Sequence, residues 1–221
     1  MTEYYIPTGP GDAEYVEKRS RFLGKVRPVA SEAEARAFID AMKKQYYDAR
    51  HNCWCYLLRG GVMRYSDDGE PQGTAGQPML EVFFRAGVTD AVCVVTRYFG
   101  GVLLGAGHLL RAYQGTAKLA LDAAGISVVR RWVKVELACG YNLFQKLTLE
   151  VSAAGGVVTD TDYGADVVLH ALLPEEQEAA FATHILDVTA GTVRAVTVGE
   201  TEQAAALGTS ESGKARQTEW N

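Results

Sequence analysis

The sequence predicts an α+β protein of two small domains, residues 1–127 and 128–200, followed by a flexible tail at residues 201–221. The 221 residues are enough for two domains of roughly 100 residues each. Segments with strand-like alternation and segments with helical spacing follow one another along most of the chain. The charge also changes at the expected boundary. Residues 1–127 contain 15 Lys and Arg against 14 Asp and Glu, whereas residues 128–200 contain 5 against 10.

In the first domain, residues 15–29 are expected to form one strand, with Phe22 and Val26 among its apolar residues. The next helix, at about residues 31–46, starts with Ser31 and Glu34 in the spacing of a capping box. The remaining elements, in chain order, are a strand at 52–59, a short strand near 62–65, an irregular turn at 66–76, a helix capped by Thr74 and ending near Ala86, a strand at 90–98, a glycine-rich turn at 99–107 and a helix from Gly107 to Ala124.

The second domain shows a simpler pattern. Its elements, in chain order, are a strand at 132–141, a helix capped by Asn142 and closed at Gly155, strands at 157–164 and 165–173, a helix opened by Pro174 and ending at Gly191, and a strand at 192–200. This β-α-β-β-α-β order is that of a ferredoxin-like domain. Residues 201–221 show little pattern, so we expect a flexible tail there.

The composition argues against several classes of protein. Hydrophobic residues make up 48% and charged residues 22%, as in an ordinary globular chain. No window approaches the roughly 18 apolar residues of a transmembrane helix, and the first residues do not resemble a secretory signal. We therefore expect a cytoplasmic protein with no membrane partner. The four cysteines are too few for a disulfide framework, so we expect them to be reduced and mostly buried.

A strand, a glycine-rich turn and a helix start at residues 97–113 form the clearest candidate for a binding site. Free backbone N–H groups and the helix dipole favour an anion at such a point. Arg97, at the exit of the strand, would pair with a phosphate through two hydrogen bonds, and Arg111 flanks the turn. The alternative is that the glycines only make a tight turn against the core. The spacing matches neither a dinucleotide-binding fingerprint nor a P-loop, so no nucleotide cofactor is expected.

The acidic turn at Asp67, Asp68 and Glu70 is a second candidate, either for a divalent cation or for acid–base chemistry. The same residue types also suit an ordinary tight turn, because Asp side chains accept from nearby N–H groups. The turn lacks the ligand spacing of a calcium site, so we expect no metal and favour a rigid recognition loop.

A third candidate precedes the strand at 52–59. Arg50 and His51 are suited to binding phosphate or exchanging protons, although a lone histidine is as often a buried structural residue. Cys53 is expected on the same strand face as His51, but no third orienting group is evident, so no catalytic residue is predicted. Tyr98, Phe99 and Tyr113 are candidates for stacking on bases, with the core as the more usual place for Phe99.

At these segments the chain resembles the IMPACT family of YigZ-type proteins. The matching strings are KRSRF at 18–22, DARHNC at 48–53, SDDGEPQGTAGQPML at 66–80 and VVTRYFGGVLLGAGHLLRAY at 94–113. The resemblance extends to about residue 200. It implies a first domain like the second domain of ribosomal protein S5, with helices on one face of a mixed sheet, and a ferredoxin-like second domain. The family's motif residues correspond here to Arg21, Arg50, His51, Asp67, Asp68, Glu70, Thr74, Arg97, Tyr98, Gly100 and Gly101.

The resemblance also implies a role. Eukaryotic relatives regulate translation initiation by binding an activator of a stress kinase, and nucleic-acid or ribosome binding has been proposed for bacterial relatives. Our first hypothesis is therefore a translation-linked regulatory binding protein, whose N-terminal groove contacts RNA, the ribosome or a translation factor through Arg50, Arg97 and Arg111. The excess of acidic residues at 128–200 argues against RNA binding by the second domain.

The second hypothesis is an enzyme that acts on a small phosphorylated or peptide-like substrate. The arginines would clamp the anion, and the turn at Asp67, Asp68 and Glu70 would supply acid–base chemistry. Both hypotheses require that Arg50 and Arg97 face one open groove.

Overall fold

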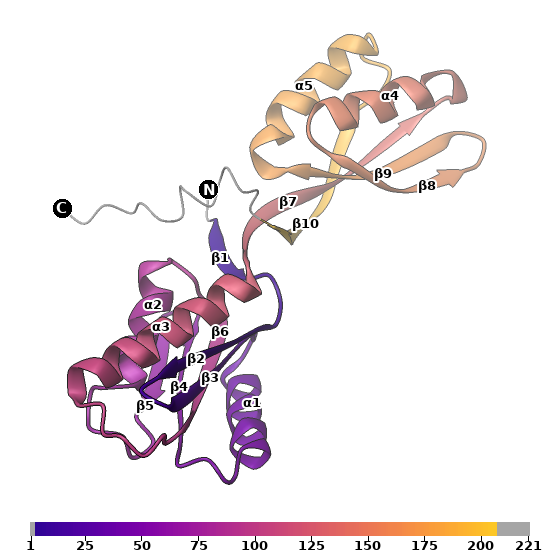
Figure 1. The fold of residues 1–221 in the computed structure, drawn as a ribbon. Helices are drawn as coiled ribbons and strands as arrows, with labels where there is room; N and C mark the ends of the chain where they lie inside the picture. Colours follow the sequence, from indigo (N-terminus) through magenta and orange to yellow (C-terminus); the bar gives the residue numbers. More distant parts are fainter. Residues whose placement is uncertain (1–2, 207–221) are drawn as a thin grey trace, which may run out of the picture. The chain divides into compact units, whose positions relative to one another are not determined.

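The computed structural model describes residues 3–206 as an α+β protein with two antiparallel sheets and five α-helices, which confirms the predicted class (Figure 1). Contacts divide the chain into two units. The N-terminal unit is mainly Tyr4–Val128 and the C-terminal unit is mainly Val129–Ala204, so the boundary falls within strand β7 (Ile126–Cys139). No helix within residues 3–206 combines the length and the apolar character that crossing a membrane requires.

The sheet of the N-terminal unit has the strand order β2-β3-β6-β4-β5, with every neighbouring pair antiparallel. These strands are β2 (Gly11–Glu17), β3 (Ser20–Pro28), β4 (His51–Leu58), β5 (Val62–Ser66) and β6 (Ala91–Tyr98), and a short strand, β1 (Tyr4–Pro7), precedes them and pairs with β7.

The single strand predicted at residues 15–29 is wrong, because this segment lies in the β2–β3 hairpin. The hairpin turns at Lys18 and Arg19, which have φ angles of 44° and 69°. Two-residue hairpin turns of this kind usually contain Asn or Gly, since other residues tolerate a positive φ poorly. The sequence therefore did not predict a turn at Lys18 and Arg19.

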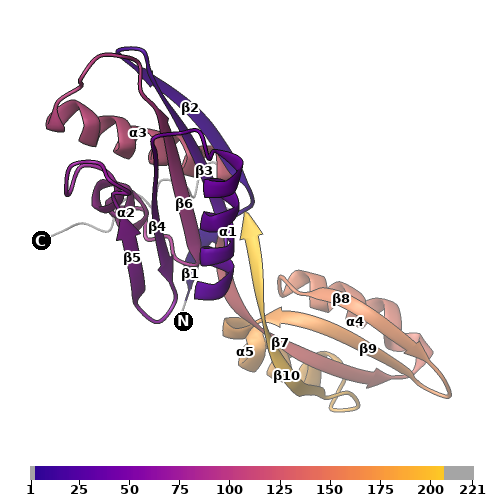
Figure 2. The same ribbon diagram turned by 90° about the horizontal axis from the view of Figure 1, so that it is seen from below.

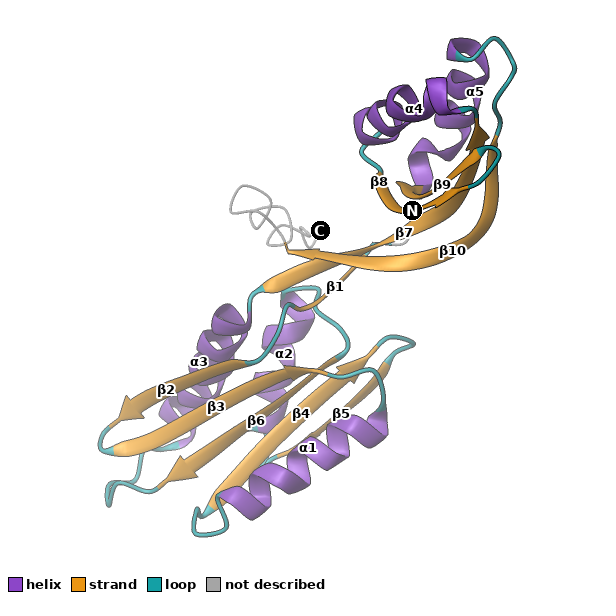
Figure 3. Ribbon diagram, turned by 90° about the vertical axis from the view of Figure 1, so that its right-hand side faces the viewer, coloured by secondary structure: helices purple, strands orange, loops and turns teal. Residues whose placement is uncertain are grey.

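Helices cover both faces of this sheet (Figures 2 and 3). Helices α2 (Gly76–Arg85) and α3 (Ala106–Ala124) pack on one face, where Phe22, Met79 and Tyr113 are buried. Helix α1 (Glu32–Gln45) packs on the other face through Ile39 and Met42. The expectation of a mixed sheet with helices on one face is thus corrected. Strand β6 is apolar on both sides along most of its length, so both of its faces need cover.

Helices α1 and α2 are capped in different ways at their N-termini. Ser31 caps α1 as predicted, since its Oγ accepts from the N–H of Glu34 at 3.2 Å. Thr74 does not cap α2, because its hydroxyl donates to the carbonyl of Pro71 at 2.6 Å. Instead, Oδ1 of Asp67 accepts from the N–H groups of residues 75 and 76, at 3.0 and 2.8 Å. The cap of α2 therefore comes from the preceding turn.

The C-terminal unit contains, in chain order, β7, α4 (Tyr141–Ala153), β8 (Val157–Tyr163), β9 (Val167–Pro174), a 3₁₀ turn (Glu175–Gln177), α5 (Glu178–Val188) and β10 (Ala195–Ala206). Strand β7 pairs with β9 and β10, and β9 pairs with β8. Both helices lie on one face of this sheet (Figure 1), where Leu147, Leu169 and Ile185 are fully buried.

Two predictions for this unit are wrong. Gly140, not Asn142, occupies the N-cap position of α4, and no side chain caps this helix. Strand β10 continues to Ala206, beyond residue 201 where the flexible tail was expected to begin. Its pairing with β7 uses backbone groups, so the weakly patterned side chains did not reveal it. The rest of the expected tail, residues 207–221, lies outside the described residues.

The four cysteines, Cys53, Cys55, Cys93 and Cys139, are free and buried, as predicted. Burial raises the pKa of the thiols of Cys53, Cys55 and Cys139. They therefore stay in the neutral form, which reacts poorly with electrophiles.

His170 lies on the face of β9 that the helices leave uncovered. We expect its protonation to make the stability of the protein depend on pH. Its Nε2 lies 2.9 Å from Oδ2 of Asp162 and its Nδ1 lies 3.3 Å from Oε1 of Glu136. The hydrogen bond with Asp162 raises the pKa of His170 above its usual value of 6.5. Its charged form is thus favoured by folding. The resulting stability is fully present below pH 6.5 and is lost as the pH rises through the raised pKa.

We therefore expect Asp162→Asn to lower the free energy of unfolding more at pH 5.5 than at pH 8.5, in urea titrations at the two values. The variant should also show a weaker loss of stability between these two pH values than the wild type. An equal effect at both values would mean that the contact contributes nothing to the pH dependence.

Candidate functional site

A pocket of about 360 Å³ opens at one end of the N-terminal unit's sheet. We call it the groove, and it is lined by Arg50, His51, Gly69, Glu70, Pro71, Arg97, Phe99, Leu103, Leu104, Gly105, Ala106 and Leu109. These residues come from the start of β4, the acidic turn, the end of β6 and the start of α3. Arg50 and Arg97 therefore face one groove, as both hypotheses require.

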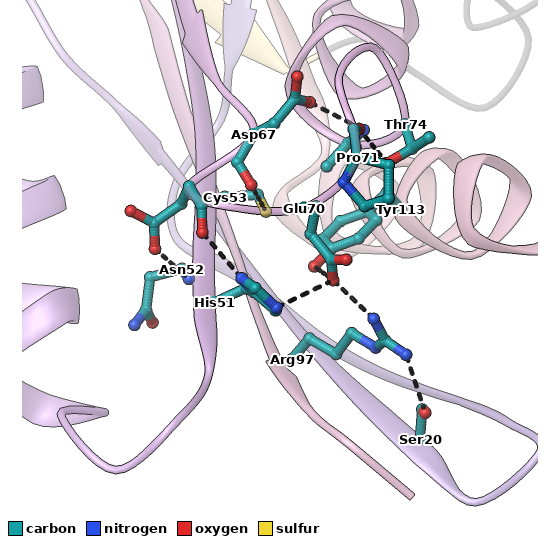
Figure 4. A network of polar contacts seen from close by, with 12 residues as sticks. Ser20, His51, Asn52, Cys53, Asp67, Glu70, Pro71, Thr74, Arg97 and Tyr113 are labelled. Atoms are coloured by element: carbon teal, nitrogen blue, oxygen red, sulfur yellow. Dashed lines mark hydrogen bonds and ion pairs between the residues drawn. The ribbon is translucent and has the colours of Figure 1, made fainter. Parts of the chain in front are cut away.

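Arg97 is held beneath the groove by a buried ion pair (Figure 4). Its Nη1 donates to Oε1 of Glu70 at 2.7 Å, and its Nη2 donates to Oγ of Ser20 at 3.4 Å. The side chains of Arg97 and Glu70 are 8% and 3% exposed. Glu70 thus balances the charge of Arg97. Each terminal nitrogen therefore gives one of its N–H groups to a protein partner, and the clamping of a phosphate by Arg97 stays a prediction.

Glu70 connects three elements of the unit. Besides Arg97 on β6, its Oε1 accepts from the hydroxyl of Tyr113 on α3 at 2.8 Å. Burial and the nearby carboxylate raise the pKa of Tyr113, so the phenol keeps its proton and remains a donor. His51 Nε2 lies 3.9 Å from the same oxygen. Glu70 therefore fixes the base of the groove.

Asp67 holds the backbone that follows the acidic turn, whereas Asp68 connects the turn to β4 and α1. Asp67 accepts from the N–H groups of residues 73, 75 and 76. Asp68 accepts from the N–H of Asn52 at 2.7 Å and pairs with Lys43 at 3.2 Å. Neither lines the groove, nor does Thr74. Within residues 3–206 no group of His, Cys, Asp or Glu is arranged to hold a metal ion.

His51 and Cys53 are also constrained by the acidic turn. His51 Nδ1 lies 2.8 Å from the carbonyl oxygen of Asp68, so this nitrogen carries a proton and donates it. Cys53 Sγ donates to the carbonyl of Asp67 at 3.0 Å. Because burial raises the pKa of this thiol, Cys53 is unsuited to act as a nucleophile.

The glycine-rich turn at residues 99–107, called the glycine turn below, has two distinct roles. Gly100 donates its N–H to Oγ of Ser20 at 3.2 Å, and a Cβ at this position would lie 2.1 Å from the carbonyl carbon of Arg19. Only glycine therefore allows the turn to pack against the β2–β3 hairpin. Gly101 has a φ of 81°. At Gly105 no side chain caps α3, so the first N–H groups of this helix are left for solvent or a ligand beside the groove.

Three further predicted binding residues lie outside the groove lining, as do Asp67, Asp68, Thr74, Gly100 and Gly101. Arg21 pairs with Glu14 at 2.8 Å on the exposed surface of the β2–β3 hairpin. Tyr98 donates from its hydroxyl to Oδ1 of Asp48 at 2.8 Å. Arg111 is exposed on α3. The structure thus brings Arg50, His51, Glu70 and Arg97 together but leaves these three apart from them.

Two cations of the β2–β3 hairpin, beside Gly100, were not predicted as site residues. Lys18 and Arg19 are exposed at the hairpin turn, against which Gly100 packs. They belong to the KRSRF string, and this pair of adjacent basic residues was the one indication in the sequence that cations gather here. Their proximity to the glycine turn depends on folding, since about 80 residues separate the two segments.

The comparisons with known proteins cover both units. A model of the Impact N-terminal domain matches residues 18–121, and a model of a domain of unknown function (DUF1949) matches residues 137–192. IMPACT family member YvyE of Bacillus subtilis is 35% identical over 194 residues, which are 86% of this chain and 89% of the relative. IMPACT family member YigZ of Escherichia coli is 31% identical over 204 residues, 90% of this chain and 100% of the relative.

A solved structure described as the crystal structure of an hypothetical protein is 31% identical, with a TM-score of 0.58, and the match covers 90% of this chain and 98% of the other. A eukaryotic relative, the Protein IMPACT homolog of Dictyostelium discoideum, matches 45% of this chain at 34% identity and 30% of its own length. Two bacterial relatives more than 30% identical over most of both chains, together with the domain models, show that the chain belongs to the IMPACT family.

Proposed function

We propose that this protein is a translation-linked RNA-binding protein, and that the groove of the N-terminal unit holds the RNA backbone. The observation that carries the proposal is the meeting of exposed Arg50 with the uncapped start of α3 in one groove. A helix start with free N–H groups attracts phosphate, and an unneutralised arginine adds a positive charge. The link to translation comes from the family resemblance.

The pairing of surface cations supports this assignment. Several exposed arginines of the N-terminal unit are paired with carboxylates, for example Arg36 with Glu32 and Arg85 with Glu81. By contrast, Arg50, Lys18 and Arg19 make no ion pair within residues 3–206. Binding a phosphate at these cations would break no existing ion pair and would release counterions, which favours polyanion binding.

The proposed domain organisation assigns RNA binding to the first domain alone. We propose that residues 1–127 form a domain like the second domain of ribosomal protein S5 and that residues 128–200 form a ferredoxin-like domain. The second carries 5 Lys and Arg against 10 Asp and Glu, so it is not expected to contact RNA. A basic segment of a partner protein is chemically better suited to it.

An enzymatic role on a small phosphorylated or peptide-like substrate has less support. Asp67 and Asp68 are engaged with backbone N–H groups, and Glu70 is buried in an ion pair. None of the three is free for the acid–base role that this hypothesis gave them.

The proposal predicts the effect of Arg50→Ala on RNA binding. Because Arg50 is exposed and unpaired, its removal should weaken binding of RNA several-fold at 0.1 M salt, an expectation of about 3- to 10-fold for one phosphate contact. The slope of log affinity against log salt should fall by about 1. Fluorescence anisotropy with a labelled RNA at several salt concentrations measures both quantities.

Arg36→Ala is the matched control, because Arg36 is an exposed arginine on α1, away from the groove, and is already paired with Glu32. It should leave affinity and salt slope unchanged. If the wild type binds neither free RNA nor ribosomes at low salt, the RNA proposal fails, and a protein partner becomes the better explanation for the groove.

A further inference from the structure

We infer that the groove takes single-stranded RNA and that one unpaired base stacks on Phe99. This inference rests on the proposed function, since it specifies which form of RNA the same groove binds. The sequence favoured a core position for Phe99, yet its side chain is 42% exposed and lines the groove. An exposed aromatic ring beside unpaired cations is the usual arrangement of a surface that binds single strands.

The ring of Phe99 is supported from below by the buried ion pair. The guanidinium carbon of Arg97 lies over this ring at 5.6 Å from its centroid, and it lies 5.5 Å from the centroid of Phe22 on the core side. Glu70 and Ser20 hold the guanidinium in place. Because Arg97 covers one face of the ring, the exposed area must belong mainly to the opposite face and the edge. The ring is thus a preorganised platform, and fixing it on binding costs little entropy.

The surroundings of Phe99 suit a base and its sugar. Leu103, 85% exposed, and Val102 add apolar surface from the same loop. Nothing lies within 4 Å of the position that a Cβ would take at Gly101, so the turn leaves open space after the ring. Arg50 and the start of α3 line the same groove and can receive the flanking phosphates.

The size of the groove and the chemistry of the ring favour a single strand over a duplex. About 360 Å³ lies near the lower end of the roughly 300–1,000 Å³ of small-ligand sites, which suits one nucleotide and not a helix of paired strands. In duplex RNA the faces of the bases are already stacked on one another. An aromatic side chain can reach a base face only where the base is unpaired.

The test uses the full chain, a short single-stranded RNA with one central 2-aminopurine, and the same strand annealed to its complement. Anisotropy gives the affinity, and 2-aminopurine fluorescence reports a change in stacking. We expect the single strand to bind more tightly than the duplex, with a fluorescence change on binding. Phe99→Leu should weaken single-strand binding roughly 5- to 150-fold, as expected for the loss of one stacked base, and should abolish the fluorescence change. Phe99→Trp should keep both.

Phe84→Leu is the matched control, because Phe84 is also an exposed phenylalanine of the N-terminal unit but does not line the groove. It should bind as the wild type does. Thermal unfolding of each variant shows whether a loss of binding comes from misfolding, and retained binding by Phe99→Trp argues against that explanation.

The outcomes separate the two proposals. If RNA binds but Phe99→Leu alters neither affinity nor fluorescence, or if duplex and single strand bind equally, the stacking inference is overturned while RNA binding stands. If no RNA binds at low salt, the proposed function fails and this inference fails with it.

Discussion

Glu70→Ala is expected to lower the free energy of unfolding by about 3–5 kcal/mol, the usual cost of removing one partner from a buried ion pair. Arg97 is only 8% exposed, so it would keep a charge that neither water nor a carboxylate compensates. The hydroxyl of Tyr113 would lose its acceptor at the same time. The loss should therefore be much larger than for an exposed ion pair, which contributes about 0–1 kcal/mol.

Urea unfolding followed by circular dichroism measures this effect. Glu81→Ala is the control, since Glu81 forms an exposed pair with Arg85 one turn away on α2, and its removal should cost less than about 0.5 kcal/mol. The double variant Glu70→Leu with Arg97→Met should recover much of the lost stability, because no unpaired charge remains buried. A cost for Glu70→Ala that equals that of Glu81→Ala would show that the pair is not buried in solution.

Asp67→Ala is expected to cost about 2–4 kcal/mol, because one carboxylate satisfies three backbone N–H groups of the acidic turn and the start of α2. The donors are at residues 73, 75 and 76, at 2.8, 3.0 and 2.8 Å. Loss of an ordinary helix cap costs about 0.5–2 kcal/mol, and hydrogen bonds to a charged acceptor are stronger than neutral ones. Since Asp67 also lies at the positive end of α2, its charge adds a favourable interaction with the helix dipole.

Hydrogen exchange measures this effect at individual amides and so separates a local loss of protection from global unfolding. The amides of residues 73, 75 and 76 should exchange faster in Asp67→Ala, under conditions where the amides of β6 remain protected. Asp67→Asn, which keeps one acceptor oxygen but not the charge, should fall between the wild type and Asp67→Ala. Asp40→Ala, a change at an exposed position on α1, provides the baseline. Unchanged exchange at the three amides would rule out the capping role.

The sequence predicted those parts of the fold whose cause is local. The cap of α1 needs only Ser31 and Glu34, three residues apart, and the helices needed only the spacing of their apolar residues. The β2–β3 turn was missed because Lys18 and Arg19 adopt a conformation that their side chains disfavour. The cap of α2 was missed because Asp67 reaches it from nine residues earlier.

For the candidate site, the sequence indicated the right segments but not the contacts of each side chain. Arg97 was expected to face a ligand, yet its charge is balanced by Glu70, which lies 27 residues away in sequence and accepts its hydrogen bond only after folding. Arg50 could be named as a cation, but only the structure shows that it is unpaired and beside the start of α3. A sequence shows which residues are charged, whereas the tertiary packing decides which of these charges is balanced by an opposite charge.

Thiol-specific reagents are expected to leave the native protein unmodified, because all four of its cysteines are buried and burial disfavours the thiolate of three of them. A fluorophore can therefore be attached at one chosen position without first removing native cysteines. Leu103→Cys would place such a label on an exposed residue at the rim of the groove. Its emission would then report ligand occupancy directly, in an otherwise unaltered chain.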